Sequence, residues 1–130
     1  MKSLATLLIT ILVCLGISGC STSPSSLVGT YSIEEGGQLK EFIRIEMQGD
    51  KFTMSEKQSG TWRTPVEITP VSKADLEKML KEPVTVDFTA LGNKNVAIIQ
   101  VPKGWRSGKF ESKTGVWLAS MLGPIELHKK

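Results

Sequence analysis

The N-terminal apolar run is the feature that most constrains how this chain folds. After Lys2, residues 4–17 are almost entirely apolar, and residues 18–19 are small. A positive start, an apolar stretch and small residues are the three parts of a secretory signal. The run is short for a membrane-spanning helix, which needs about 20 apolar residues. Residues 1–19 are therefore expected to be a removed signal, which leaves residues 20–130 to fold as one small domain.

The end of this signal resembles the lipobox of bacterial lipoproteins. Ile17 supplies the branched apolar position, Ser18 and Gly19 supply the small positions, and Cys20 is the acceptor. The resemblance implies cleavage before Cys20 by signal peptidase II, a diacylglyceryl thioether on its sulfur, and an acyl chain such as palmitate on the new amino group. The alternative is an ordinary signal with a chance cysteine, but the A-x-A site typical of such a signal is absent.

The same resemblance implies a location. In this family an aspartate after the cysteine favours the inner membrane, whereas here Ser21 follows Cys20. The expected location is the outer membrane, where the lipid on Cys20 anchors a domain that faces the periplasm. The Ser/Pro-rich residues 20–26 are predicted to be a short tether, and residues 27–130 a single β-rich domain.

The number of cysteines and the net charge limit what can stabilise the mature domain and what it can bind. The chain has two cysteines; Cys14 leaves with the signal and Cys20 carries lipid, so the mature domain has no disulfide to support its core. The formal net charge is +3, and the positive residues are interspersed with negative ones. This pattern predicts that nucleic acid is not a partner.

Alternating apolar and polar residues dominate the rest of the chain. The clearest case is a hairpin, in which residues 39–48 and 51–57 alternate on either side of a tight turn at Gly49 and Asp50. Similar short runs are found at residues 27–33, 84–90, 96–101 and 116–122. This spacing predicts a mostly β fold, a small antiparallel barrel or sandwich of seven to nine strands.

One short helix is predicted mid-chain over residues 72–82. Ser72 is its N-cap, with Asp75 as the acidic residue three positions later. Pro83 ends the helix, because the residue before a proline avoids helical torsion angles. Just before the helix, two prolines flank residues 66–68, which predicts an edge strand.

The opening Gly29-Thr30-Tyr31, followed by a long hairpin, is similar to the start of lipocalin-like bacterial domains. The likeness covers only the opening of the domain and implies a barrel that carries a small amphiphilic ligand. A lipocalin has tryptophan where Tyr31 stands and places its helix near the C-terminus, whereas the helix predicted here lies mid-chain.

Residue types that carry enzyme chemistry are scarce. His128 is the single histidine, and a catalytic or zinc-binding histidine needs partner residues. The mature chain offers no thiol nucleophile and no glycine-rich phosphate loop. Clustered carboxylates such as Glu41, Glu46 and Asp87 remain as an enzyme alternative. We therefore predict a protein that is not an enzyme and uses no cofactor or metal.

The segment with most binding potential is a predicted loop over residues 102–108. It presents Trp105 and Arg106 between glycines, with Lys103 and Lys109 beside them. Tryptophan and arginine are enriched in binding hot spots, so these four residues are candidate contacts with a partner. The alternative is that Trp105 caps the open end of a barrel.

Phe42 is a further candidate contact, because it is predicted to lie on a charged strand face beside Lys40 and Arg44. The alternative for Phe42 is packing against a neighbouring hairpin. Trp62 and Trp117 lie within alternating runs and are expected in the core.

Three functions fit these patterns. The first is a membrane-anchored lipoprotein that binds a protein partner as an inhibitor, an immunity or exclusion factor, or an accessory subunit. The second is a lipocalin-like carrier of a small amphiphile, which requires an unfilled barrel interior. The third is an enzyme built on clustered carboxylates. The scarcity of catalytic residues favours the first.

Overall fold

The computed structural model describes residues 23–130, so the predicted signal and the lipid acceptor Cys20 lie outside the described residues. In chain order the elements are the 3₁₀ helix η1 (Pro24–Leu27), β1 (Gly29–Glu35), β2 (Gln38–Gln48), β3 (Lys51–Gln58), β4 (Thr61–Trp62), β5 (Val66–Pro70), α2 (Lys73–Leu80), β6 (Thr89–Gly92), β7 (Ala97–Gln100), β8 (Trp105–Ser107), β9 (Phe110–Ser112), β10 (Val116–Ser120), β11 (Gly123–Glu126) and β12 (His128–Lys129).

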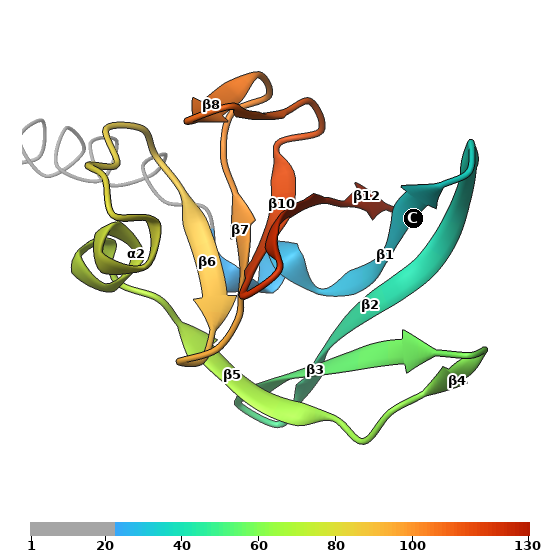
Figure 1. Cartoon of the computed structure of the whole chain (residues 1–130). Coiled ribbons are helices and arrows are strands. Elements are labelled where there is room, and N and C mark those ends of the chain that lie inside the picture. Colours follow the sequence, from blue (N-terminus) through green and yellow to red (C-terminus); the bar gives the residue numbers. More distant parts are fainter. Residues whose placement is uncertain (1–22) are drawn as a thin grey trace, which may run out of the picture.

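The main sheet curves into a nearly closed antiparallel barrel (Figure 1). Its path runs β11-β10-β7-β6-β5-β3-β2-β1-β12, and β4 pairs with β3 beside this path. The chain itself joins the two ends of the sheet, because β11 pairs with β10 whereas β12, which directly follows Leu127, pairs with β1. The predicted mostly β, antiparallel barrel with one mid-chain helix is confirmed.

The predicted hairpin at Gly49 and Asp50 is confirmed as β2–β3, but β2 contains a bulge at Phe42. In the register of β1 with β2, Tyr31 lies opposite Ile43 and Ser32 lies opposite Glu41, so Phe42 has no opposite residue. A bulge places an extra residue in one strand and redirects its side chain. Phe42 therefore packs, half-buried, against the barrel core instead of lying on the charged face.

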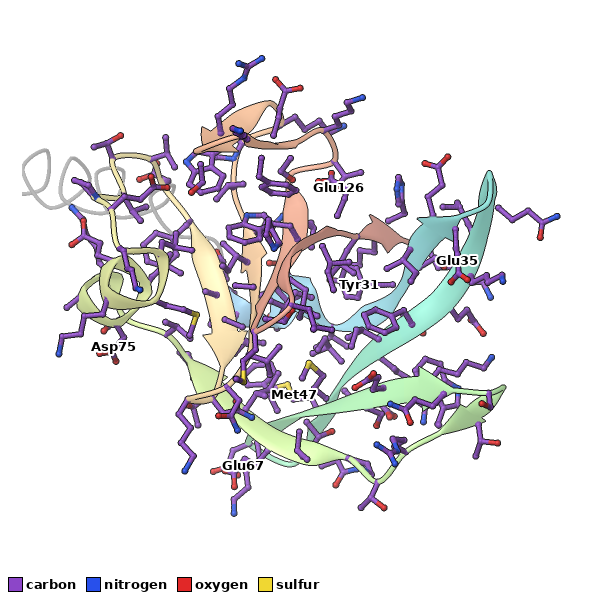
Figure 2. The ribbon with its side chains drawn as sticks, in the orientation of Figure 1. Tyr31, Glu35, Met47, Glu67, Asp75 and Glu126 are labelled. Carbon is purple, nitrogen blue, oxygen red and sulfur yellow. The ribbon has the colours of Figure 1, made fainter. Side chains whose placement is uncertain are left out.

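The barrel interior holds one apolar cluster. Its buried members are Leu27, Tyr31, Ile43, Ile45, Met54, Ile68, Leu91, Ile98, Leu118 and Leu127. Figure 2 shows Tyr31 inside the curve of the sheet, whereas Glu35, Glu67 and Asp75 lie at its outside. These ten buried apolar side chains, eight of them on strands around the barrel, fill much of its interior with protein.

Helix η1 closes one end of this interior. The Tyr31 hydroxyl donates a hydrogen bond of 2.7 Å to the Leu27 carbonyl, and Ser26 Oγ donates one of 3.0 Å to Gln100 Oε1. Burial raises the pKa of Tyr31 to about 12, because a phenolate would lose its hydration there. The tether predicted over residues 20–26 thus overlaps a folded helix that begins at Pro24.

A second apolar cluster lies on the outer face of the barrel, under α2. Successive strand residues point to opposite faces, so Ile98 and Leu118 point inward while Ile99 and Trp117 point outward to meet Leu76 of the helix. The Ser72 hydroxyl accepts a hydrogen bond of 3.2 Å from the Asp75 amide at the helix N-terminus. Lys81 ends the helix in a left-handed conformation, and the predicted helix is confirmed.

Three local predictions are wrong. The strand predicted from Val84 begins only at Thr89, because the Val84 amide donates a 2.8 Å hydrogen bond to the Glu77 carboxylate, away from any strand. Strand β5 is not an edge, since its first half pairs with β3 and its end with β6. Trp62 is half-buried outside the core, where the Arg44 Cζ lies 4.5 Å from the centroid of its ring.

An ion-pair cluster ties the C-terminus to the barrel wall. Glu41 accepts 2.9 Å contacts from Lys57 on one oxygen and from Lys130 on the other. These hydrogen bonds to Lys57 and Lys130, with the attraction of the two ammonium groups, lower the pKa of Glu41 from 4.5 to about 2. The two lysine ammonium groups thus stabilise the ionised form of the Glu41 carboxyl group in the folded state.

We expect the Glu41 cluster to make the free energy of unfolding depend on pH in the acidic range. A lowered carboxyl pKa stabilises the folded state above the unfolded value of 4.5, and this contribution disappears as the pH falls towards about 2. Glu41→Gln should flatten the stability profile over this window in denaturant titrations. Glu34→Gln is the matched control, because Glu34 is exposed and forms no ion pair within residues 23–130. Equal flattening by both variants would contradict this assignment.

Candidate functional site

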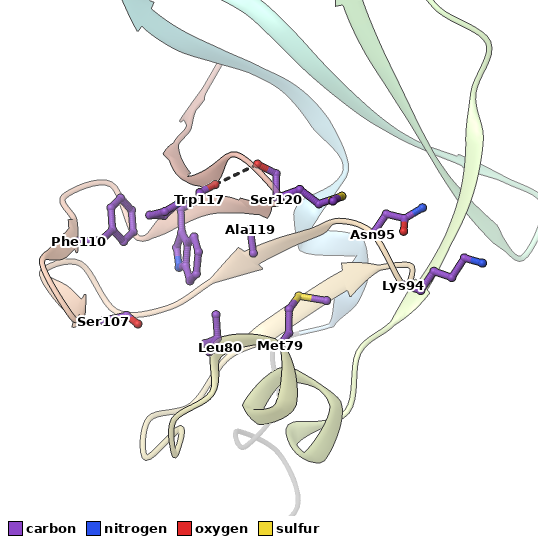
Figure 3. A pocket seen from close by; sticks show the side chains of 12 residues that line it. Met79, Leu80, Lys94, Asn95, Ser107, Phe110, Trp117, Ala119 and Ser120 are labelled. Carbon is purple, nitrogen blue, oxygen red and sulfur yellow. Dashed lines mark hydrogen bonds between the residues drawn. The ribbon is translucent and has the colours of Figure 1, made fainter.

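A cleft of about 410 Å³ lies between α2, the β8–β9 hairpin and the outer face of the barrel (Figure 3). Met79 and Leu80 form its wall on the helix side, and Trp117 and Ala119 form its wall on β10. The remaining lining residues are Lys94, Asn95, Ser107, Phe110, Ser120, Met121, Gly123 and Pro124. Its volume falls within the range of about 300–1,000 Å³ that is usual for ligand pockets.

The β8–β9 hairpin bounds the aromatic end of the cleft. Trp105 stacks on Trp117 with ring centroids 5.5 Å apart, and the Phe110 ring lies 5.1 Å from that of Trp117. A hydrogen bond from the Ser107 hydroxyl to the Glu82 carboxylate also ties the hairpin to the segment after α2. The segment predicted as a loop over residues 102–108 therefore contains β8, and its tryptophan packs against the barrel.

Trp117 is the central residue of this aromatic end. Its side chain is 2% exposed, which confirms that it belongs to the core. Within residues 23–130 its indole N–H has no hydrogen-bond partner. A buried unpaired donor costs about 1–3 kcal/mol, so the packing of the ring must outweigh this cost.

The opposite end of the cleft is polar. Lys94 and Asn95, on the turn between β6 and β7, lie across the cleft from Phe110 and Trp117 (Figure 3). The Asn93 side chain holds this turn, since its oxygen accepts a hydrogen bond of 2.8 Å from the Asn95 amide. The cleft is therefore amphipathic along its length.

The β10–β11 turn exposes two large apolar side chains beside the cleft. Met121 is 91% exposed and Leu122 is 94% exposed. A hydrogen bond within the turn stabilises it, since Ser120 Oγ donates a 3.0 Å hydrogen bond to the Gly123 carbonyl. Adjacent apolar side chains that a defined turn holds in solvent are typical of an interaction surface.

The structure separates the residues predicted to bind a partner. Arg106 is exposed and pairs across the hairpin with Glu111 at 2.9 Å, and Lys103 and Lys109 are also exposed. Trp105, however, is half-buried and stacks on Trp117 in the apolar cluster on the outer face of the barrel. Phe42 lies on β2, in the barrel wall, and does not line the cleft.

The sequence does not indicate the exposure of Met121 and Leu122, because the apolar pattern of residues 116–122 predicts one continuous strand. β10 ends at Ser120, and Gly123 has a positive φ of 102° that suits a turn. The Gly123-Pro124 pair was the available signal. Two apolar residues directly before such a turn signal are positioned at its tip.

No three His, Cys, Asp or Glu side chains of residues 23–130 gather in a way that could hold a metal ion. None of the helices in this range is both long and apolar enough to span a membrane. Comparison with protein-family models, curated proteins and solved structures finds no match to the chain.

Proposed function

We propose that this chain is a lipoprotein, anchored through Cys20 in the outer membrane and facing the periplasm, whose β domain binds a protein partner without catalysing a reaction. The lipobox resemblance of residues 17–20 supports the anchor. An inhibitor, an immunity or exclusion factor and an accessory subunit are the roles that suit such a domain.

The observation that carries the partner-binding proposal is the exposed pair Met121 and Leu122. Single large apolar side chains at a surface are common, whereas here two adjacent ones are each more than 90% exposed at one turn. Burying each against a partner would contribute roughly 1.5–3 kcal/mol. The exposed cations Lys103, Arg106 and Lys109 lie on and beside the β8–β9 hairpin, at the opposite end of β10 from this turn.

The alternative function is carriage of a small amphiphile. A lipocalin-like carrier would hold its ligand inside the barrel, where this chain places ten buried apolar side chains. The cleft outside the barrel is the feature that favours binding of a small molecule.

Crosslinking in native envelopes, followed by capture of the chain and mass spectrometry, tests the partner proposal. We expect a single stoichiometric protein partner, and Leu122→Asp should reduce its recovery by about tenfold or more, as expected for a hot-spot residue. Leu39→Asp is the matched control, because Leu39 is also exposed, at 59%, but lies on β2. Absence of a protein partner, or equal recovery with both variants, would overturn the proposal.

A further inference from the structure

The cleft has the polarity of a site for an amphiphile. Trp117, Phe110 and Leu80 make one end mainly apolar, with Ser107 beside them, whereas Lys94 and Asn95 lie at the other end, where the Lys94 side chain extends away from the aromatic rings (Figure 3). A ligand that is apolar at one end and charged at the other would match both ends at once. The volume of about 410 Å³ is in the lower part of the usual range for ligand pockets, which suits one acyl chain better than two.

The charged residues at the cleft determine which charge on the head group of a ligand is favoured. Lys94 is its single charged lining residue, and in residues 23–130 its ammonium group forms no ion pair. The neighbouring groove adds the ammonium of Lys78 and the carboxylate of Asp75. Glu82 lies beyond the lining and accepts the Ser107 hydrogen bond at the aromatic side. An anionic head group at Lys94 is therefore favoured over a cationic one.

We propose that this cleft binds a single-chain amphiphile with a carboxylate head. The carboxylate lies at Lys94 and Asn95, and the acyl chain extends along Met79 and Leu80 towards Phe110 and Trp117. Met121 of the proposed partner contact lines the cleft, whereas Leu122 does not, so Leu122→Asp alters the partner contact without changing the lining of the cleft.

Photoaffinity labelling of the full chain in its native envelopes tests the site. The probe is dodecanoate with a diazirine at the end of its chain, and its twin has the same chain with a trimethylammonium head. We expect the carboxylate probe to label the segments around Leu80 and Phe110 about tenfold more than the twin does, with excess dodecanoate competing. Equal labelling by the two probes, or labelling spread over the whole surface, would overturn the proposal.

Two variants locate the ligand within the cleft. Lys94→Glu should reverse the preference between the probes, while Lys51→Glu, at the start of β3, should leave it unchanged. Met79→Trp should fill the cleft and abolish labelling while the protein stays folded. Leu122→Asp should retain labelling, so loss of the protein partner and loss of the amphiphile are distinguishable outcomes. Unchanged labelling of both Lys94→Glu and Met79→Trp would show that the ligand binds elsewhere.

Discussion

Trp117→Ala is expected to lower the free energy of unfolding by about 3–5 kcal/mol, the usual cost of truncating a buried tryptophan. The ring is 2% exposed and contacts both Trp105 and Phe110. Its removal leaves a cavity under the β8–β9 hairpin, which pairs only within itself in the described sheet topology. Loss of the unpaired indole N–H offsets part of this cost. Denaturant unfolding followed by circular dichroism measures the change.

Trp62→Ala is the matched control for this prediction. Trp62 is half-buried on the outer face of β4, where it contacts Arg44 and Lys57 through its ring. Cation–π contacts of this kind contribute about 0.5–1 kcal/mol at exposed sites, so the loss should be near 1 kcal/mol. Equal losses in the two variants would contradict the assignment of Trp117 to the core and of Trp62 to the surface.

The fold could be predicted where local chemistry decides it. Gly49 and Asp50 determine a turn by their own conformational preferences, and Ser72 determines a helix start by a hydrogen bond within four residues. Alternation then predicts which face of each strand is buried. Such signals depend on neighbouring residues in the chain, so the barrel class and the helix were accessible from sequence.

The errors arose where distant contacts override local pattern. The bulge at Phe42 shifts which face its side chain occupies, and alternation alone does not reveal a bulge. The extended segment after Pro83 looks like a strand, but the Glu77 side chain takes the hydrogen bond of the Val84 amide. Trp62 follows the pattern of a core residue, yet β4 has only β3 beside it.

The candidate site could be predicted only in part. The sequence predicts Trp105 as either a partner contact or a cap on the open end of the barrel, whereas its stacking on Trp117 joins two strands that are not paired with each other. The cleft combines residues of α2, the β6–β7 turn, the β8–β9 hairpin and the β10–β11 turn. Only the folded chain brings these four segments together, so no spacing in the sequence could indicate the cleft.

Cys20→Ala is expected to release the protein from the membrane fraction almost completely. The lipobox interpretation assigns three acyl chains to Cys20, and one chain alone gives only marginal, reversible membrane binding. Alanine has no sulfur to carry the thioether, so the variant should also lack the mass of the lipid. Fractionation of envelopes with immunodetection measures location, and intact mass spectrometry measures the modification.

The chain's other cysteine provides the control for this prediction. Cys14 lies within the apolar run of the predicted signal and would be removed with it, so Cys14→Ala should leave both the lipid and the membrane location unchanged. Because the two variants remove the same chemical group at different positions, any difference between them reports on position 20. A Cys20→Ala protein that keeps its lipid mass would show that the lipobox interpretation is wrong. A protein that loses the mass but stays on the membrane would show that something other than Cys20 anchors it.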